Sequence, residues 1–340
     1  MSTYQALKGI NVKSLASDPA NTKYGQIWYN NTAKQIKFIG NNSGAWSSGG
    51  NLPDVRMNCH MSGGTQTAGL YAGGGNGSNA YQDDTFEYNG TSWSEVNDFP
   101  KNQSDFAGGG TQTASFSSGG NIPNDTRQVE SFDYDGTNWT AGGNLSTASG
   151  QGAACGTATA GMHCGGTSGG GTIIDETFEY DGSSWTTSGD LPENQAYHYA
   201  VGSQTASLSC FHLINGTAQS TASYEYNGTA WSAGGQMSTR RTAGGLFGIQ
   251  TLAVGAGGGG GNDAGTSKES VESYNGTAWA EETPTLNQAA YRHANGTNAA
   301  GLLTGGNDSP VGSGPNATMN RTEEWNTPPL TGGVVKMDVS

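Results

Sequence analysis

Six side chains near one recurring position of the sequence carry most of the chemistry that this chain could perform. They are His60, Tyr197, His198, Tyr291, Arg292 and His293. When the chain is aligned on a glycine that returns about every 46 residues, His60, His198 and Arg292 share one column. The other members of that column are Phe106, Gly152 and Gly244. Because two histidines and a tyrosine can bind copper, a metal site has to be considered.

A copper site is the weaker interpretation of this column. His60 and His198 stand three repeats apart, and no cysteine neighbours a suitable tyrosine in the pattern. We therefore expect these polar side chains to face a central channel, where they would contact water or a ligand. We predict no bound metal and no cofactor.

Motifs of known enzyme classes are missing from the sequence. It contains no Gly-x-Ser-x-Gly elbow, no Walker loop and no His-Glu-x-x-His motif. The run Gly257–Gly261 is not followed by Lys-Ser/Thr, as a phosphate loop would require. The acidic pairs Asp83-Asp84, Asp175-Glu176 and Glu281-Glu282 leave calcium binding as an alternative to solvated loops. We predict that the chain is not an enzyme and has no catalytic residues.

The composition excludes several partners. The net charge is −14 with only 14 basic residues, which argues against binding to nucleic acid or to an anionic membrane surface. No apolar stretch approaches the length of a membrane span. The start, Met1-Ser2-Thr3-Tyr4, lacks a secretory signal, so we expect synthesis in a cytoplasm.

The four cysteines lack metal-ligand spacing. Cys59, Cys155, Cys164 and Cys210 form no Cys-x-x-Cys pair, and we expect small, buried, reduced side chains. A disulfide between Cys155 and Cys164 across one hairpin is the alternative.

An aromatic motif repeats along the chain. Tyr88-Asn-Gly-Thr-Ser-Trp93 recurs four more times, ending in Trp139, Trp185, Trp231 and Trp279. Because Asn-Gly and Asp-Gly favour two-residue hairpin turns, we expect Phe86 to lie opposite Trp93. Counting outward from the turn in the same way places Glu272 opposite Trp279, so we predict that the fifth repeat is less stable.

A second motif keeps the same period. Gly64-Thr-Gln-Thr-Ala leads to Gly73-Gly74, and five of the six such stretches end in Gly-Gly. The fourth ends in Phe211-His212, which would form a pocket wall or, as we favour, mark local repacking. Two hairpins in about 46 residues amount to four short strands, the size of a propeller blade.

Gly-Gly, then Tyr, then Trp five residues later resembles the Kelch repeat, over residues 46–326. The resemblance implies an all-β, six-bladed β-propeller whose first strands line a central channel. The sixth repeat ends at Trp325 with no tryptophan after it, so we expect the strand around Trp46 to complete that blade and close the ring. The aromatic positions of the repeat are Trp46, Trp93, Trp139, Trp185, Trp231, Trp279 and Trp325.

The two ends of the chain lie outside the repeat. Tyr24-Gly-Gln-Ile-Trp-Tyr-Asn-Asn-Thr-Ala-Lys-Gln-Ile-Lys-Phe38 predicts two strands around a turn. It resembles a short Gly-x-Ile-Trp-Tyr-Asn…Ile-Lys module of tailed-phage structural proteins; an ordinary hairpin packed on the propeller is the alternative. We expect residues 1–45 to form an anchor with a short β-hairpin, and residues 327–340 to form a tail that adds a strand or a contact arm.

These features favour a non-enzymatic structural protein of a bacteriophage virion, as a capsid decoration or a tail-fibre component. Its expected location is the virion surface. Its expected partners are other virion proteins, contacted through residues 1–45, and host-surface glycans or proteins. A cellular Kelch-type module that binds glycans or proteins is the alternative, and a copper radical oxidase is a weaker one.

Overall fold

The chain folds into two compact units. A computed structural model divides it into Ala45–Asn326, the larger unit, and Met1–Gly44 with Thr327–Ser340, the smaller unit. The described residues contain β-strands and one short 3-10 helix, η2 (Gly169–Gly171), but no α-helix. None of their helices is long and apolar enough to cross a membrane. The structure describes residues 13–17, 27–39, 44–76, 78, 80–214, 218–259, 268–289, 291–307, 318–327 and 332–335.

The strands of the larger unit come in six groups of four. The first group is β5 (His60–Thr65), β6 (Ala68–Ala72), β7 (Thr85–Tyr88) and β8 (Trp93–Val96). The second is β9 (Ala107–Thr111), β10 (Ala114–Ser118), β13 (Ser131–Tyr134) and β14 (Trp139–Ala141). The third is β15 (Ala153–Thr157), β16 (Ala160–Cys164), β17 (Thr177–Tyr180) and β18 (Trp185–Thr187).

The remaining groups repeat this order. The fourth is β20 (Tyr199–Ser203), β21 (Ala206–Cys210), β24 (Tyr224–Tyr226) and β25 (Trp231–Ala233). The fifth is β26 (Gly245–Ile249), β27 (Leu252–Ala256), β28 (Val271–Tyr274) and β29 (Trp279–Glu281). The sixth is β30 (Tyr291–Thr297), β31 (Ala300–Asn307), β32 (Thr322–Asn326) and β4 (Ala45–Ser48). Short strands in the loops are β11 (Asn121–Ile122), β12 (Thr126–Arg127), β19 (Gln195–Ala196), β22 (Leu213–Ile214) and β23 (Ala218–Gln219).

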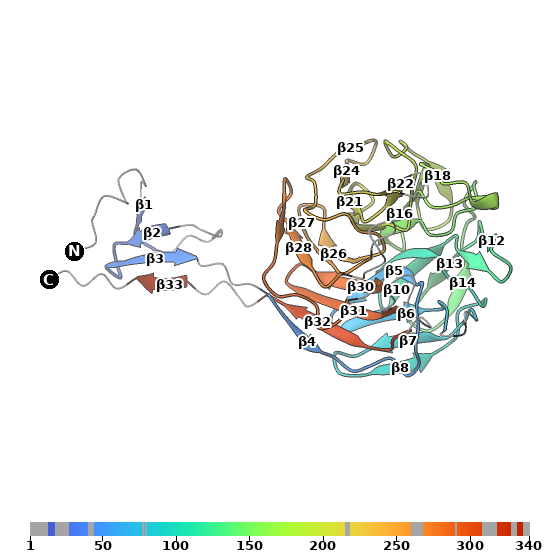
Figure 1. Cartoon of the computed structure of the whole chain (residues 1–340), viewed down its shortest axis with the longest axis horizontal. Coiled ribbons are helices and arrows are strands. Elements are labelled where there is room, and N and C mark those ends of the chain that lie inside the picture. The colour runs from blue at the N-terminus through green and yellow to red at the C-terminus, as the bar shows by residue number, and fades with distance from the viewer. Residues whose placement is uncertain are drawn as a thin grey trace. The chain divides into compact units, whose positions relative to one another are not determined.

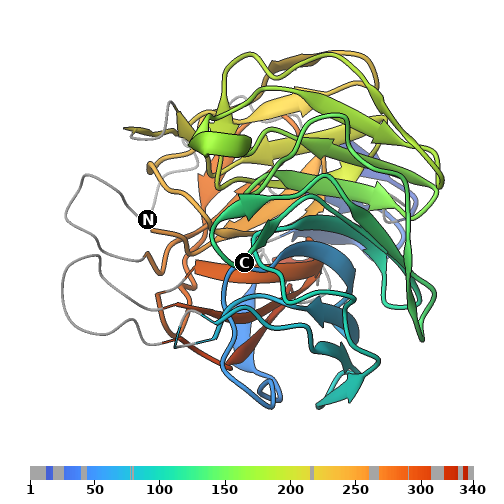
Figure 2. The same cartoon turned by 90° about the vertical axis from the view of Figure 1, so that its right-hand side faces the viewer.

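Neighbouring groups meet through their first strands. β5 pairs in parallel with β9, which merges the first two groups into one curled sheet of eight strands. β9 contacts β15, β15 contacts β20, β20 contacts β26, and β26 contacts β30. β30 in turn contacts β5. Figures 1 and 2 show the sheets of this unit from two directions.

The sixth group joins the two ends of the larger unit. β4 pairs antiparallel with β32, and Trp46 lies opposite Trp325. The two rings are 5.2 Å apart between centroids. The predicted pairing of these tryptophans is confirmed, although they are far apart in the sequence.

The Asn/Asp-Gly hairpins have longer loops than the sequence predicted. Tyr88 lies opposite Trp93 and Phe86 opposite Glu95, so the predicted pairing of Phe86 with Trp93 is wrong. The Asn89 side chain accepts hydrogen bonds from the backbone N–H groups of Thr91 and Ser92, which stabilises a four-residue loop. Tyr–Trp pairs with centroids 4.7–5.0 Å apart recur in the first five groups.

The fifth group shows the consequence of this register. Tyr274 lies opposite Trp279, and Glu272 lies opposite Glu281 and not opposite the tryptophan. The fully buried Glu272 carboxylate is 2.5 Å from the guanidinium of Arg241, which is also buried. The predicted reason for a weaker fifth repeat is therefore wrong.

Three kinds of side-chain hydrogen bond link the second group to the first. Trp139 Nε1 donates to the Thr85 hydroxyl, and the Tyr134 hydroxyl donates to Glu87. Gln112 Nε2 donates to the carbonyls of Gly69 and Tyr88. Versions of these bonds recur at other interfaces of the larger unit, as Trp93–Thr322, Trp185–Ser131, Trp231–Thr177, Trp279–Ser223, Tyr88–Glu324, Tyr180–Asp133, Tyr226–Glu179 and Tyr274–Glu225, and through Gln66, Gln204 and Gln250.

The smaller unit contains strands from both ends of the chain. Its sheet order is β1 (Lys13–Leu15), β2 (Ile27–Asn30), β3 (Gln35–Ile39) and β33 (Gly332–Val335). β2 and β3 form the predicted hairpin, in which Asn30 Oδ1 accepts hydrogen bonds from the N–H groups of Thr32 and Ala33. β33 pairs antiparallel with β3, so the tail supplies a further strand to the N-terminal sheet. Of the two predicted end segments, residues 1–12, 18–26, 40–43, 328–331 and 336–340 lie outside the described residues.

Candidate functional site

The ends of the six first strands surround a cavity. It has a volume of about 160 Å³, and each first strand contributes a glycine to its wall. The six glycines all have positive φ, between 99° and 119°. A methyl group on Gly64 would collide with the carbonyl of Ala68, so this position requires glycine. The wall glycines are Gly64, Gly110, Gly156, Gly202, Gly248 and Gly296.

Asn295 adds a polar side chain to the cavity wall. It is buried, its Nδ2 lies 2.9 Å from His293 Nε2, and its Oδ1 has no hydrogen-bond partner. The other side chains of the wall are mainly small or apolar, including Val201, Leu246 and Phe247. The cavity therefore offers few groups for chemistry.

His198 lies in the protein interior. Its Nδ1 is 3.0 Å from the Ser209 hydroxyl, and its Nε2 is 3.0 Å from the carbonyl oxygen of Cys164. The side chain is fully buried and bridges the third and fourth groups. This corrects the expectation that His198 faces a channel: the residue precedes β20, where side chains pack between sheets.

The same column contains Phe106, which is also buried. Its ring stacks on Phe99 with centroids 4.8 Å apart. His293 is buried too and meets Tyr71 edge to face, with centroids 5.2 Å apart. The backbone of His60 pairs with Ala107. The side chains of His60, Tyr291 and Arg292 lie outside the described part of the structure.

Two histidines outside the aligned column, His163 and His212, have similar roles. His163 contacts the hydroxyls of Ser118 and Ser149, and burial lowers its pKa to about 4. His212 lies 3.2 Å from Glu193, and burial lowers its pKa to about 4 as well. Both side chains are therefore neutral at pH 7 and serve packing.

The opposite ends of the first strands carry a second recurring feature. The second residue before each of five first strands has positive φ although it is not glycine. Each such residue after the first donates its backbone N–H to the carbonyl of the preceding one, at 2.7–3.1 Å. These residues, which we call the left-handed ring, are Asn58, Asp105, Gln151, Tyr197 and Ala243.

Asp105 is the charged member of the left-handed ring. It is buried, and Asn121 Nδ2 donates to its carboxylate at 2.9 Å. Burial raises the pKa of Asp105 to about 6, although the hydrogen bonds from Ser104 and Asn121 oppose that shift. The sequence alignment had singled out only Tyr197 of the ring, as a neighbour of His198.

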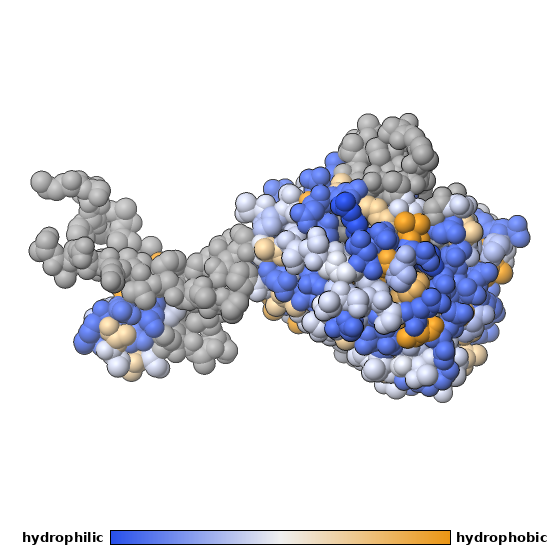
Figure 3. Space-filling model, turned by 90° about the horizontal axis from the view of Figure 1, so that it is seen from below, coloured by the Kyte–Doolittle hydropathy of each residue, from blue (hydrophilic) through white to orange (hydrophobic). Residues whose placement is uncertain are grey.

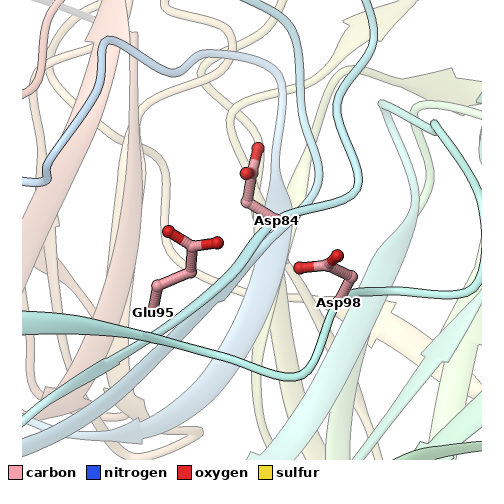
Figure 4. Close-up of side chains that lie close together, drawn as sticks. All are labelled: Asp84, Glu95 and Asp98. Carbon is pink, nitrogen blue, oxygen red and sulfur yellow. The ribbon is translucent and has the colours of Figure 1, made fainter.

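Three carboxylates gather beside the first group. Asp84, Glu95 and Asp98 each place an oxygen within 4.8 Å of the others. Figure 4 shows these three side chains close together. Burial and the nearby Asp83 and Asp84 raise the pKa of Asp98. Of these three carboxylates, only Asp84 belongs to an acidic pair that the sequence pointed to. The guanidinium of Arg56 pairs with Asp84 and neutralises part of this charge, so the cluster is less favourable for a cation than its carboxylates suggest.

The other acidic pairs contact hydroxyl groups. Thr147 donates to Glu176 at 3.2 Å, and Ser238 donates to Glu281 at 2.9 Å. At the Phe211-His212 position, the Phe211 ring packs against Gly244 and Gly255, and Arg241 lies 5.0 Å above it. The Phe211 side chain therefore fills space between neighbouring strands, in keeping with local repacking.

All four cysteines are buried free thiols. Cys155 lies opposite Met162, and Cys164 lies opposite Ala153, so these two cysteines do not face each other across the hairpin. Burial raises the pKa of Cys59 to about 11 and that of Cys155 to about 12. The thiols are therefore protonated at pH 7.

Comparison with known proteins gives a fold and no family. No family model and no curated protein matches the chain. Its structure is similar to that of YjhT, with a TM-score of 0.68 and 12% sequence identity. The match covers 85% of this chain and all of that one. At this identity the likeness concerns the fold alone.

Proposed function

We propose that the larger unit is a closed, six-bladed, Kelch-like β-propeller that acts as a binding module and not as an enzyme. The succession of first-strand contacts from β5 through β30 and back to β5 supports a closed ring. The pairing of β4 with β32 supports closure by the two ends of this unit. Closure removes exposed strand edges, which suits a surface displayed to solvent.

The roles of the buried histidines favour binding over catalysis. His163 and His198 are engaged by serine hydroxyls and a backbone carbonyl inside the fold. A general base must reach its substrate, and a copper ligand must reach the metal. Side chains held in these positions can do neither without repacking.

The division into two units suggests how the module is carried. Both chain ends belong to the smaller unit, while the repeats make up the larger unit. One unit can therefore attach to an assembly while the other is displayed. Together with the Gly-x-Ile-Trp-Tyr-Asn resemblance, this arrangement supports a structural protein of a phage virion, either a capsid decoration or part of a tail or fibre. The two-unit organisation is the observation that carries the proposal.

The test is the presence of the chain in purified particles. Quantitative mass spectrometry should find it at a fixed copy number. A chain trimmed to residues 45–326 should remain folded and monomeric but be absent from particles. Absence of the full chain from particles, or normal incorporation of the trimmed chain, would contradict the proposal.

A further inference from the structure

The loops between the third and fourth strands of the first five groups begin with either asparagine or aspartate. The first, fourth and fifth groups have Asn89, Asn227 and Asn275, and the second and third have Asp135 and Asp181. All five side chains are exposed, and each residue is followed by glycine. Glycine has no side chain that would hinder a reaction of its own backbone nitrogen. The three asparagine loops therefore deserve a test for chemistry between the amide side chain and this nitrogen.

The loop polarises the asparagine amide. Thr91 and Ser92 both donate their backbone N–H groups to Asn89 Oδ1, at 3.0 Å. Asn227 and Asn275 accept the same two bonds, at 2.9–3.0 Å. Two N–H groups on a carbonyl oxygen stabilise the negative charge that develops there when its carbon is attacked. The loop thus makes the side-chain carbon Cγ a better electrophile.

The nitrogen of the following glycine is free to attack. The N–H groups of Gly90, Gly228 and Gly276 make no hydrogen bond to any described residue. In the first group, a bond from Gly90 N to Asn89 Cγ closes a five-membered imide ring. The bond from Cγ to Nδ2 breaks, and Nδ2 leaves as ammonia with the proton of the glycine N–H. Water then opens the ring at either carbonyl and gives aspartate or isoaspartate.

The loops of the second and third groups already contain the aspartate product. Oδ1 of Asp135 and Oδ1 of Asp181 each accept two backbone N–H bonds from the same positions, at 2.7–2.9 Å. At Asp181 these bonds lower the pKa of the carboxyl. One face of the larger unit is mostly hydrophilic (Figure 3), so additional carboxylates suit this kind of surface. An asparagine loop that becomes an aspartate loop therefore keeps its hydrogen bonds.

Asn295-Gly296 has the same two residues in a different environment. Asn295 lies within β30, is buried, and lies opposite Leu302. Its Oδ1 has no hydrogen-bond partner among the described residues, so no N–H group stabilises charge on this oxygen. Burial also keeps water away from an imide. The remaining Asn-Gly pairs, at 76–77 and 215–216, extend outside the described residues.

We propose that Asn89, Asn227 and Asn275 are sites of spontaneous deamidation, which the fold directs to these loops and away from Asn295. Each conversion replaces a neutral amide by a carboxylate. Three conversions add three negative charges and change the net charge from −14 to −17. The exposed surface of the larger unit thus becomes more acidic as the protein ages. The inference does not depend on the proposed function.

Peptide mass spectrometry on the full chain, aged at mildly alkaline pH, tests the proposal. It detects the mass gained when an amide becomes a carboxylate, and chromatography separates aspartate from isoaspartate. Asn295 is the matched control within the same chain. A second sample aged in denaturant removes the effect of the fold. The variant Asn89→Asp carries the product from the start, and its melting temperature shows whether the loop accepts it.

In the folded chain, Asn89, Asn227 and Asn275 should convert at least about tenfold faster than Asn295, a difference of about 1.4 kcal/mol in the barrier. In denaturant the four rates should become similar. Asn89→Asp should melt at the temperature of the wild type. Loops that stay intact in the folded chain, or that react no faster than Asn295, would overturn the proposal. A large fall in the melting temperature of Asn89→Asp would overturn it as well.

Discussion

The interface between the first and sixth groups differs from the one between the fifth and sixth. At the first, Gln66 donates to the carbonyls of Gly301 and Trp325. Tyr88 donates to Glu324 at 2.7 Å, and Trp93 Nε1 donates to Thr322 at 3.0 Å. All three recurring bonds are therefore present where the two ends of the repeat region meet.

The interface between the fifth and sixth groups lacks these bonds among the described residues. Trp46 occupies the position of Trp93, but Val271 stands where the other interfaces have serine or threonine. Trp46 Nε1 is consequently buried without a partner. Trp325 replaces the tyrosine. Apolar contacts hold this interface instead, with Trp46 edge to face on Phe247 at 6.2 Å and Phe247 against Gly301.

The difference shows that repeated sheets need not be joined in the same way. Hydrogen bonds fix the register between groups, whereas apolar packing supplies energy with less directional constraint. An unpaired buried N–H is costly, so the fifth–sixth interface should be the more easily opened of the two.

The largest loss of stability is expected from a substitution within the fifth group. Glu272→Ala leaves the buried Arg241 charge without its carboxylate and should cost about 3–5 kcal/mol of stability. Denaturant unfolding measures the loss. Glu281→Ala, opposite Glu272 but exposed, is the control and should change stability little. Equal losses from the two variants would refute the importance of the buried pair.

Trp46→Ala should have the next largest effect. It removes the ring that packs on both Trp325 and Phe247, at a cost of about 3 kcal/mol, near the low end for tryptophan because Trp46 is only partly buried. Trp28→Ala, in the smaller unit, should lower the melting temperature of the larger unit less. Similar shifts from the two variants would argue against a structural role for Trp46 in the sixth group.

Tyr88→Phe probes the hydrogen-bonded interface. Loss of the bond to Glu324 should cost about 1–2 kcal/mol at pH 7. Burial raises the pKa of Tyr88 from 10 to about 12, so ionisation favours unfolding. Wild-type stability should therefore fall as the pH rises from 10 to 12, and less steeply in the variant. A pH titration of the melting temperature measures this, and an unchanged slope would contradict the assignment.

Val271→Thr should change stability least, and should raise it where the other substitutions lower it. A hydroxyl at this position would give Trp46 Nε1 the partner that its equivalents have, and should stabilise the protein by up to about 1 kcal/mol. Val254→Thr, at another buried valine, should destabilise it. A loss of stability in both variants would show that the missing hydroxyl does not explain the comparison.

Local signals predicted the sheets better than they predicted the side-chain environments. The signals for the hairpins, such as Gly64 and the Asn89-Gly90 turn, lie within a few residues of the turns themselves. The hairpins could therefore be located from the sequence. The hairpin register was wrong because the Asn89 side chain bonds to two N–H groups and lengthens the loop. The repeat placed His198 in the correct column, but its burial depends on Ser209 and Cys164 from neighbouring strands.

The most direct test is to engineer a disulfide between the two ends of the larger unit and to measure how much of it forms. Ala45 and Asn326 are opposite each other in the β4–β32 pair, at a spacing that a disulfide can span. The native thiols are buried and protonated, so they should not compete. Oxidised Ala45→Cys/Asn326→Cys should form an intramolecular crosslink in nearly all molecules, detected by peptide mass spectrometry. Free thiols or intermolecular dimers as the main product would contradict closure of the larger unit through its ends.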